Sequence, residues 1–101
     1  MSEAAEACRI DVWLWRARFF KTRGLAARAV AEGSVRLLRG GARIRLDKPG
    51  RTLRPGDGLL LTLGDRQVAM RIEALGTRRG PAPEARALYS VLDELAPGGK
   101  P

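Results

Sequence analysis

Apolar residues in the first third of the chain recur every three to four positions, which is the spacing of one helix face. Two stretches show this spacing, residues 9–20 and residues 23–32. Their apolar positions are Ile10, Trp13, Leu14 and Ala17, then Leu25, Ala26, Ala29 and Val30. Thr22 suits the N-cap of the second stretch, and Gly33 suits a left-handed C-terminal stop. The pattern predicts two short helices, Arg9–Phe20 and Arg23–Glu32.

Beyond Gly33, apolar and polar residues alternate, which is typical of strands. Residues 34–37 and 43–46 alternate in this way, and residues 59–63 and 67–72 are interpreted as two more strands. Gly40-Gly41 separates the first two runs and Gly64-Asp65 the last two. Both dipeptides suit tight hairpin turns. The middle of the chain therefore predicts a small antiparallel sheet.

The end of the chain predicts one more helix, from Pro83 to about Leu95, because proline favours the first helical position. Its apolar face consists of Ala85, Leu88, Tyr89 and Leu92. The order of elements predicts an α+β fold with two N-terminal helices, a small sheet and a C-terminal helix. A length of 101 residues leaves room for one domain. We expect it at residues 9–96, between flexible tails at 1–8 and 97–101.

Several classes of protein are disfavoured by residue content. The chain has one cysteine, Cys8, and no histidine, which disfavours a disulfide, a zinc cluster and a histidine-based triad. Its glycines form neither a phosphate loop nor a dinucleotide fingerprint. The opening residues do not resemble a secretory leader, and no apolar run approaches the roughly 20 residues that span a bilayer. We expect a cytoplasmic, non-enzymatic protein without metal, cofactor or membrane partner.

Positive charge is concentrated in the first half of the chain. The protein has 19 Lys and Arg against 11 Asp and Glu, for a net charge of +8. Residues 9–54 contain 13 basic and 3 acidic residues, whereas the rest contains 6 basic and 8 acidic ones. A basic block of this kind favours a polyanionic partner, because each neutralised phosphate releases counterions.

The predicted helices and the strand after them present this charge outward. The basic residues concerned are Arg16, Lys21, Arg23, Arg28, Arg36 and Arg39. A guanidinium grips a phosphate with two hydrogen bonds, and the start of the second helix offers free N–H groups beside Thr22. Trp15 and Phe20 are open to two interpretations, base stacking or, as we favour, packing against the C-terminal helix. Asp11 is expected to start the first helix or to orient an arginine.

Residues 9–23 have the sequence RIDVWLWRARFFKTR. This run resembles the opening of the αL RNA-binding motif, first known from small-subunit ribosomal protein four. It is most similar to the bacterial family of heat-shock ribosome-associated protein fifteen. Further segments follow in the order of that family, namely Ala27-Arg28, residues 32–35, Lys48-Pro49, residues 55–57 and residues 79–89. The resemblance covers roughly residues 9–92.

The resemblance implies two helices packed on a strongly bent sheet, with RNA on the helix-strand face. It also implies binding to ribosomal RNA on the large ribosomal subunit, particularly one that carries a stalled nascent chain on peptidyl-tRNA, in ribosome recycling or rescue under stress. The positions that match the family's contacts are Arg9, Lys21, Thr22, Arg23, Arg28 and Lys48. The charge pattern adds Arg16, Arg36 and Arg39 as expected RNA-binding residues.

The sequence departs from the family's pattern at several places, the mildest being Ile10 in place of the usual leucine and a slightly longer stretch before Lys48-Pro49. Gly24 stands where a serine is common, which removes one hydroxyl contact. Residues 37–41 replace an Asn-Gly turn after the first strand. Arg39, Arg43 and Arg45 are candidates to supply phosphate contacts in the altered hairpin.

Other readings remain open at this level. A DNA-binding helix-turn-helix regulator is the main alternative, although the second helix has no Asn or Gln to recognise adenine. The αL motif also accompanies RNA-modifying enzymes, but no length remains here for a catalytic domain. A protein-protein adaptor is a further alternative. Because no long exposed apolar stripe is evident, we expect a monomer.

Overall fold

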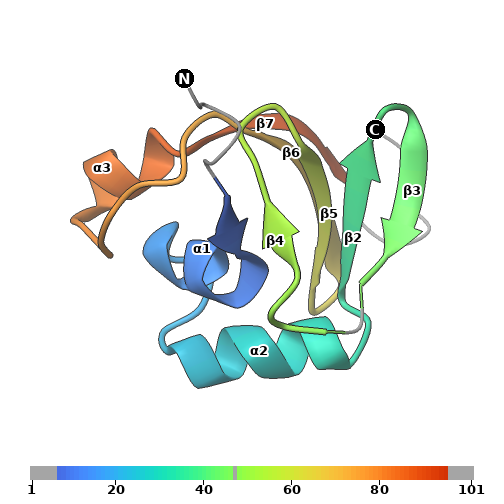
Figure 1. The fold of residues 1–101 in the computed structure, drawn as a ribbon, viewed down its shortest axis with the longest axis horizontal. Coiled ribbons are helices and arrows are strands. Elements are labelled where there is room, and N and C mark those ends of the chain that lie inside the picture. The colour runs from blue at the N-terminus through green and yellow to red at the C-terminus, as the bar shows by residue number, and fades with distance from the viewer. Residues whose placement is uncertain (1–6, 47, 96–101) are drawn as a thin grey trace.

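The protein folds into two N-terminal helices held against a bent antiparallel sheet. The structure is a computed structural model and describes residues 7–46 and 48–95. In chain order the elements are β1 (Cys8–Arg9), α1 (Ile10–Arg16), α2 (Arg23–Ala31), β2 (Val35–Arg39), β3 (Ala42–Arg45), β4 (Thr52–Leu53), β5 (Gly58–Leu63), β6 (Arg66–Ile72), α3 (Ala82–Arg86) and β7 (Tyr89–Leu95). Strands β6 and β7 curve over α1 toward α3 (Figure 1). The predicted α+β class with a bent sheet is confirmed.

Both N-terminal helices end in the same hydrogen-bonded motif. At the end of α1, Phe19 N–H bonds to Leu14 O, and Arg18 N–H bonds to Trp15 O. Arg18 is left-handed, with φ 67°. This is a Schellman motif, in which the left-handed residue is usually glycine. It stops α1 at Arg16, so the predicted extension to Phe20 was wrong.

At the end of α2 the left-handed position is Gly33, as predicted, with φ 86°. Gly33 N–H bonds to Val30 O, and Ser34 N–H bonds to Ala29 O. Glycine adopts this conformation without the steric penalty of a side chain. Of the apolar face predicted for α2, Ala26 and Val30 are buried, whereas Leu25 is 46% exposed.

The main sheet has five antiparallel strands in the order β3-β2-β5-β6-β7. The β2–β3 turn contains Gly40 and Gly41, both with positive φ, as the predicted tight hairpin requires. Strands β1 and β4 form a separate two-stranded sheet in which Cys8 pairs with Leu53. The predicted N-terminal tail therefore extends one residue too far among the described residues, because Cys8 belongs to a strand. Residues 1–6 and 97–101 of the predicted tails lie outside the described residues.

The core lies between α1, α2 and the inner face of the sheet. Its largest fully buried side chains are Ile10, Trp13, Leu14, Val30, Val35, Leu37, Leu46, Leu53, Leu59, Leu61, Met70 and Ile72. On β2 the inner residues Val35 and Leu37 alternate with outer Arg36 and Leu38, which fixes the strand's orientation. Trp13 anchors α1, since its indole N–H donates to Ala74 O at 2.9 Å.

The predicted C-terminal helix is wrong in extent. Its helical part, α3, begins at Ala82 and ends at Arg86, after which residues 89–95 form strand β7. The strand pairs with β6, for example Tyr89 with Ile72, across a register shift. Backbone pairing along β6 satisfies the N–H and C=O groups of this segment and outweighs its helical apolar spacing.

Candidate nucleic-acid interface

The start of α2 forms the most open part of the candidate interface. Thr22 is the N-cap, and its hydroxyl accepts from Leu25 N–H at 3.0 Å. Lys21, Thr22 and Arg23 are all exposed. The N–H groups of the first turn that Thr22 leaves free point out of the helix at its positive dipole end. This arrangement matches the chemistry of a phosphate oxygen.

Arg28 lies one to two turns further along α2. Its side chain is 74% exposed and contacts Glu32, also exposed, at 3.3 Å. A solvent-exposed i,i+4 pair of this kind is weak, so Arg28 can exchange Glu32 for a phosphate at little cost. The residue remains available to an anionic ligand.

Arg9 is held in place by a buried acid. Its guanidinium donates Nε to Asp11 Oδ1 at 3.1 Å and Nη2 to Oδ2 at 2.9 Å. Its guanidinium also lies beside Gly50, in the turn closed by Arg51 N–H bonding to Lys48 O. The exposed Lys48 and Arg9 therefore belong to one part of the surface. The expectation that Asp11 orients an arginine is confirmed.

Arg36 and Arg39 have different surroundings although both lie on β2. Arg36 donates Nη1 to Gly33 O at 2.8 Å, at the end of α2. Arg39 forms a two-pronged pair with Asp57, at 3.0 and 2.7 Å. Asp57 is 8% exposed and Arg39 33% exposed. Arg39 is thus largely committed to an internal ion pair, which its charge alone did not indicate.

Arg16 is the predicted contact that the structure turns furthest inward. It is half-buried, and its Nη1 donates to Gly76 O at 2.9 Å and to Leu75 O at 3.3 Å. These bonds fix the 75–76 segment to the end of α1. The sequence predicted that Arg16 points outward to a phosphate, and it did not predict that Arg16 holds residues 75–76 against α1.

Two further arginines, which the sequence prediction did not single out, join α1 to residues 74–80; this contact is called the seam below. Arg18 donates Nε to Gly80 O at 2.6 Å. Arg79 donates in return to Trp15 O at 3.1 Å and to Phe20 O at 3.4 Å. The carbonyl of Trp15 in the last turn of α1, which already accepts from Arg18 N–H, thereby gains a cationic partner. Arg79 lies in the segment 79–89 that resembles the family, which marked it as a residue of interest. Its distant partners could not be deduced from the sequence.

The aromatic residues of the first predicted helix differ in burial: Trp13 is buried, whereas Trp15, Phe19 and Phe20 are half-buried. Trp13 and Phe19 pack with Tyr89, with the Phe19–Tyr89 ring centroids 4.9 Å apart. Phe20 packs partly against the core. Of the two residues left open between stacking and packing, Phe20 therefore packs, although against the core and not against a C-terminal helix, and the interpretation of Trp15 stays open.

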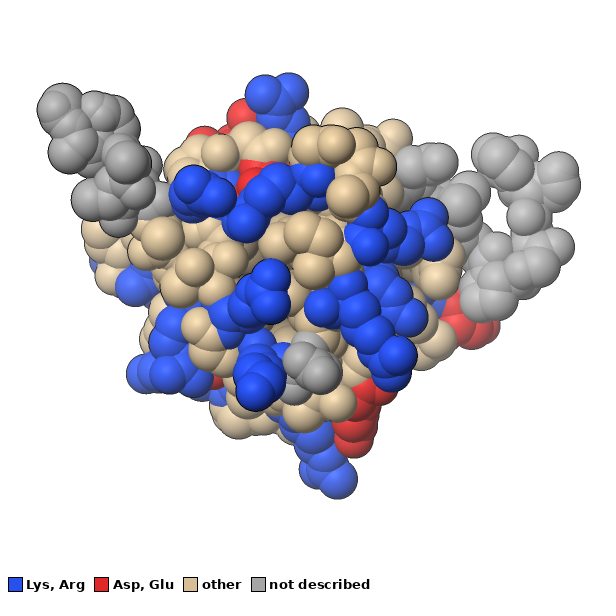
Figure 2. Space-filling model, turned by 45° about the vertical axis from the view of Figure 1, so that its right-hand side comes forward, with Lys and Arg blue, Asp and Glu red and all other residues tan. Residues whose placement is uncertain are grey.

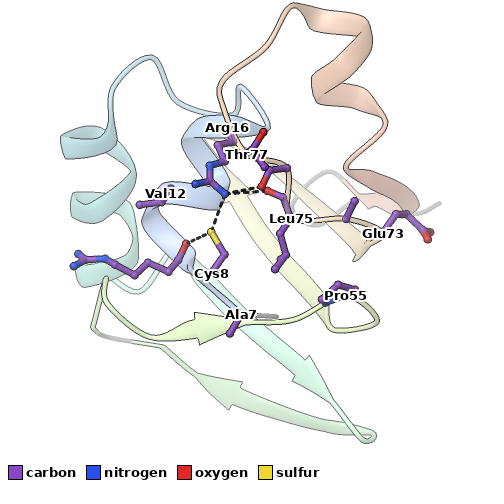
Figure 3. A pocket seen from close by; sticks show the side chains of 11 residues that line it. Ala7, Cys8, Val12, Arg16, Pro55, Glu73, Leu75 and Thr77 are labelled. Atoms are coloured by element: carbon purple, nitrogen blue, oxygen red, sulfur yellow. Dashed lines mark hydrogen bonds between the residues drawn. The ribbon is translucent and has the colours of Figure 1, made fainter. Parts of the chain in front are cut away.

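Beside Arg16 the surface is hollowed into a cavity of about 720 Å³ (Figure 3). Cys8, Val12, Arg16 and Leu75 line it. Burial raises the pKa of the Cys8 thiol, against the lowering effect of the Arg16 charge. The thiol is therefore protonated at neutral pH and unsuited to nucleophilic chemistry. Among the described residues, no three His, Cys, Asp or Glu side chains gather as a metal site would require.

Basic side chains dominate the surface around β2 and β3. Figure 2, turned so that this side comes forward, shows many Lys and Arg side chains and fewer acidic ones. Within residues 7–46 and 48–95, no helix has the length and apolar content needed to cross a membrane. A broad cationic surface suits binding of an extended polyanion.

A capped, arginine-bearing helix pair on a bent antiparallel sheet defines this chain as an αL-motif protein. A solved structure, described as the trimeric structure of Vibrio cholerae heat shock protein 15, superposes with a TM-score of 0.74 and 38% sequence identity. The similarity covers 85% of this chain and 82% of that one. The chain therefore belongs to the heat shock protein 15 family.

Curated relatives agree with this assignment. The Haemophilus influenzae heat shock protein 15 homolog is 35% identical over 90 residues, which cover 89% of this chain and 65% of that protein. Escherichia coli heat shock protein 15 is 37% identical over 86 residues, with coverage of 85% and 61%. The chain thus spans less than two thirds of the length of these relatives. A search against models of protein families found no match. None of these relatives is named as a DNA-binding regulator, so that alternative gains no support.

Proposed function

We propose that this protein binds ribosomal RNA through the α2 surface, defined here as Arg9, Lys21, Thr22, Arg23, Arg28 and Lys48. The observation that carries the proposal is the start of α2, where a capped helix N-terminus is flanked by exposed Lys21 and Arg23. Helix N–H groups and guanidiniums recognise phosphate oxygens and not base sequence. Recognition of structured RNA would then depend on shape and backbone, since the A-form major groove is too narrow for side chains.

The proposal of a ribosomal partner is supported by the family resemblance. The relatives are named as heat shock proteins, and residues 9–23 of this chain resemble the αL RNA-binding motif. We infer that the target is the large ribosomal subunit carrying a stalled nascent chain, with peptidyl-tRNA as a further partner, in rescue or recycling under stress. Such a factor works in the cytoplasm, where ribosomes are, and acts by binding without catalysis.

A monomer is the simplest form for such a factor, and it stays a prediction. The Vibrio cholerae relative is described as trimeric. In this chain Val91 and Leu92 are exposed on the edge strand β7. Sedimentation equilibrium at micromolar concentration measures the mass in solution directly.

Co-sedimentation with separated ribosomal subunits across a salt series tests the proposal. We expect selective migration with the large subunit that weakens as salt rises, because phosphate contacts release counterions. The variant Arg23→Gln/Arg28→Gln should reduce the large-subunit fraction, and Arg54→Gln/Arg86→Gln, which removes the same charge elsewhere, should not. Equal binding to both subunits and to duplex DNA would overturn the ribosomal assignment.

A further inference from the structure

The outer face of the β2–β3 hairpin carries arginines that the α2 surface does not use. In the strand register Arg36 stands opposite Arg45, and Leu38 stands opposite Arg43. Paired residues project on the same side of a sheet. Because Val35 and Leu37 of β2 point into the core, Arg36, Arg43 and Arg45 share the outward side.

Among residues 7–46 and 48–95, no acidic side chain pairs with the outward charges of Arg43 and Arg45. Both arginines are exposed. Strands β2, β3 and β5 contain no Asp or Glu. By contrast, Arg39 on the inner side of β2 is fully paired with Asp57. Like charges directly opposite each other destabilise a sheet, so an anionic ligand would relieve a repulsion built into Arg36 and Arg45.

The surface beside these arginines is partly apolar. Arg36 is also registered with Leu60, and Leu38 with Gly58. A Cβ at Gly58 would lie 3.1 Å from Leu38 Cβ, so Leu38 packs closely over β5 at this glycine. Leu38 and Leu60 are half-buried. The face therefore offers exposed guanidiniums beside half-buried leucines.

We propose that the outer face of the β2–β3 hairpin, formed by Arg36, Arg43 and Arg45, is a second RNA-binding surface that takes the phosphate backbone of a different RNA segment. The inference rests on the proposed RNA-binding function. Interfaces with a nucleic-acid backbone are polar and strongly positive, whereas the centre of a protein-protein interface is apolar and depleted of charge. Three arginines around half-buried leucines fit the first description. Two surfaces on opposite sides of the sheet would let one molecule bridge two RNA segments.

Titration of the full chain with two RNAs tests the proposal. One is a stem-loop long enough to cover the α2 surface alone, and the other is a larger folded ribosomal RNA fragment. The variant Arg43→Gln/Arg45→Gln should weaken binding of the large fragment by about tenfold at low salt. It should also lower the magnitude of its salt slope by about 2. Binding of the stem-loop should change less than about twofold.

Two control variants distinguish the loss of charge on this face from a general loss of charge and from a disturbed fold. Arg54→Gln/Arg86→Gln removes two exposed charges elsewhere and should leave the large-fragment slope unchanged. Arg43→Lys/Arg45→Lys keeps the charge in the same strand and should restore most of the slope. Circular dichroism and thermal unfolding establish that each variant is folded before titration.

The outcomes distinguish this inference from the function on which it rests. No greater effect for Arg43→Gln/Arg45→Gln than for the charge control would overturn the second surface while leaving RNA binding intact. Equal loss on both RNAs would overturn the claim that a separate segment is bound. If a polyglutamate peptide displaced RNA from wild type but not from the variant, the face would belong to an acidic polypeptide. Failure of the wild type to bind either RNA would overturn the proposed function itself.

Discussion

The carboxylate of Asp11 holds the guanidinium of Arg9 in a two-pronged pair whose acid is buried and whose base is not. The side chain of Asp11 is 5% exposed, whereas that of Arg9 is 53% exposed. Asp11 Oδ1 also accepts from Val12 N–H at 2.8 Å, which fixes the acid at the start of α1. The hydrogen bonds and the charge of Asp11 raise the pKa of Arg9. Asp11 thus aims a cation at the surface while remaining part of the fold.

Replacing Asp11 should therefore weaken RNA binding without removing a positive charge. In Asp11→Asn the guanidinium of Arg9 loses its fixed direction, and we expect affinity to fall a few-fold because more rotamer freedom is lost on binding. The salt slope should not decrease, since the number of cations is unchanged. Fluorescence anisotropy across a salt series measures both quantities.

The matched control for Asp11 is Asp65→Asn, which alters an exposed acid in the β5–β6 turn. Its affinity should rise slightly or stay level, as for any loss of a distant negative charge. An identical response of the two variants would mean that Asp11 does not position Arg9 for binding.

The cap of α2 gives a second prediction. Thr22→Ala removes the hydroxyl that accepts from Leu25 N–H, and loss of an N-cap lowers the free energy of unfolding by about 1 kcal/mol. Thr22→Ser retains the acceptor and should unfold close to wild type. Urea unfolding monitored by circular dichroism measures the difference. Equal stability of the alanine and serine variants would show that the cap contributes nothing.

The helix boundaries at Thr22 and Gly33 were predictable because their signals are local. A hydroxyl at the N-cap and a glycine in the left-handed position act within one turn of the chain. The β2–β3 turn belongs to the same group, since Gly40-Gly41 determines its own backbone shape. Such features are visible in the sequence before any tertiary contact is known.

Strand β7 was not predictable in this way. Residues 85–92 have helical apolar spacing, and only pairing with β6 makes residues 89–95 extended. The premature end of α1 is similar, because Arg18 takes a position that usually requires glycine and bonds to Gly80. Non-local partners decided both cases.

The sequence predicted which basic residues belong to the candidate site, but not which of them bond within the protein. Lys21 and Arg23 are exposed as the charge pattern suggested. Arg16 and Arg39 instead donate hydrogen bonds inside the molecule, to Gly76 O and to Asp57. Net charge indicates how many cations exist, but only the tertiary structure determines which ones have internal partners.

The seam between α1 and residues 74–80 gives a third prediction. Arg79→Gln removes the donors to Trp15 O and Phe20 O, and we expect the free energy of unfolding to fall by about 1–2 kcal/mol. RNA affinity at temperatures where the variant is folded should stay within about twofold, because Arg79 is half-buried and internally bonded. Chemical unfolding and RNA titration measure the two effects separately.

The neighbouring Arg78→Gln is the control for this seam. Arg78 is exposed and pairs with the exposed acid Glu84. Surface pairs of this kind contribute little to stability. A larger loss for Arg78→Gln than for Arg79→Gln would contradict the assignment of the seam to Arg79.

The pair of Arg39 and Asp57 predicts how stability changes with acid. Burial alone raises the pKa of Asp57, but hydrogen bonds from Arg39 and from Arg54 N–H, with the charges of both arginines, bring that pKa below its ordinary value. A carboxyl whose pKa is lower in the folded than in the unfolded state contributes stability above its unfolded pKa. That contribution is lost as the pH falls through the folded pKa.

Asp57→Asn should accordingly be less stable than wild type at neutral pH by about 1–3 kcal/mol, because Arg39 and Arg54 N–H lose a charged acceptor. The difference should persist down to about pH 4, the ordinary range of an aspartate, and shrink steadily below it. Urea unfolding between pH 2.5 and 7 measures the gap, and other carboxyls cancel because both proteins contain them. Asp65→Asn, in an exposed turn, should run parallel to wild type. A gap for Asp57→Asn that stayed constant to the lowest pH would mean that the ionised carboxylate is not what stabilises this end of β2.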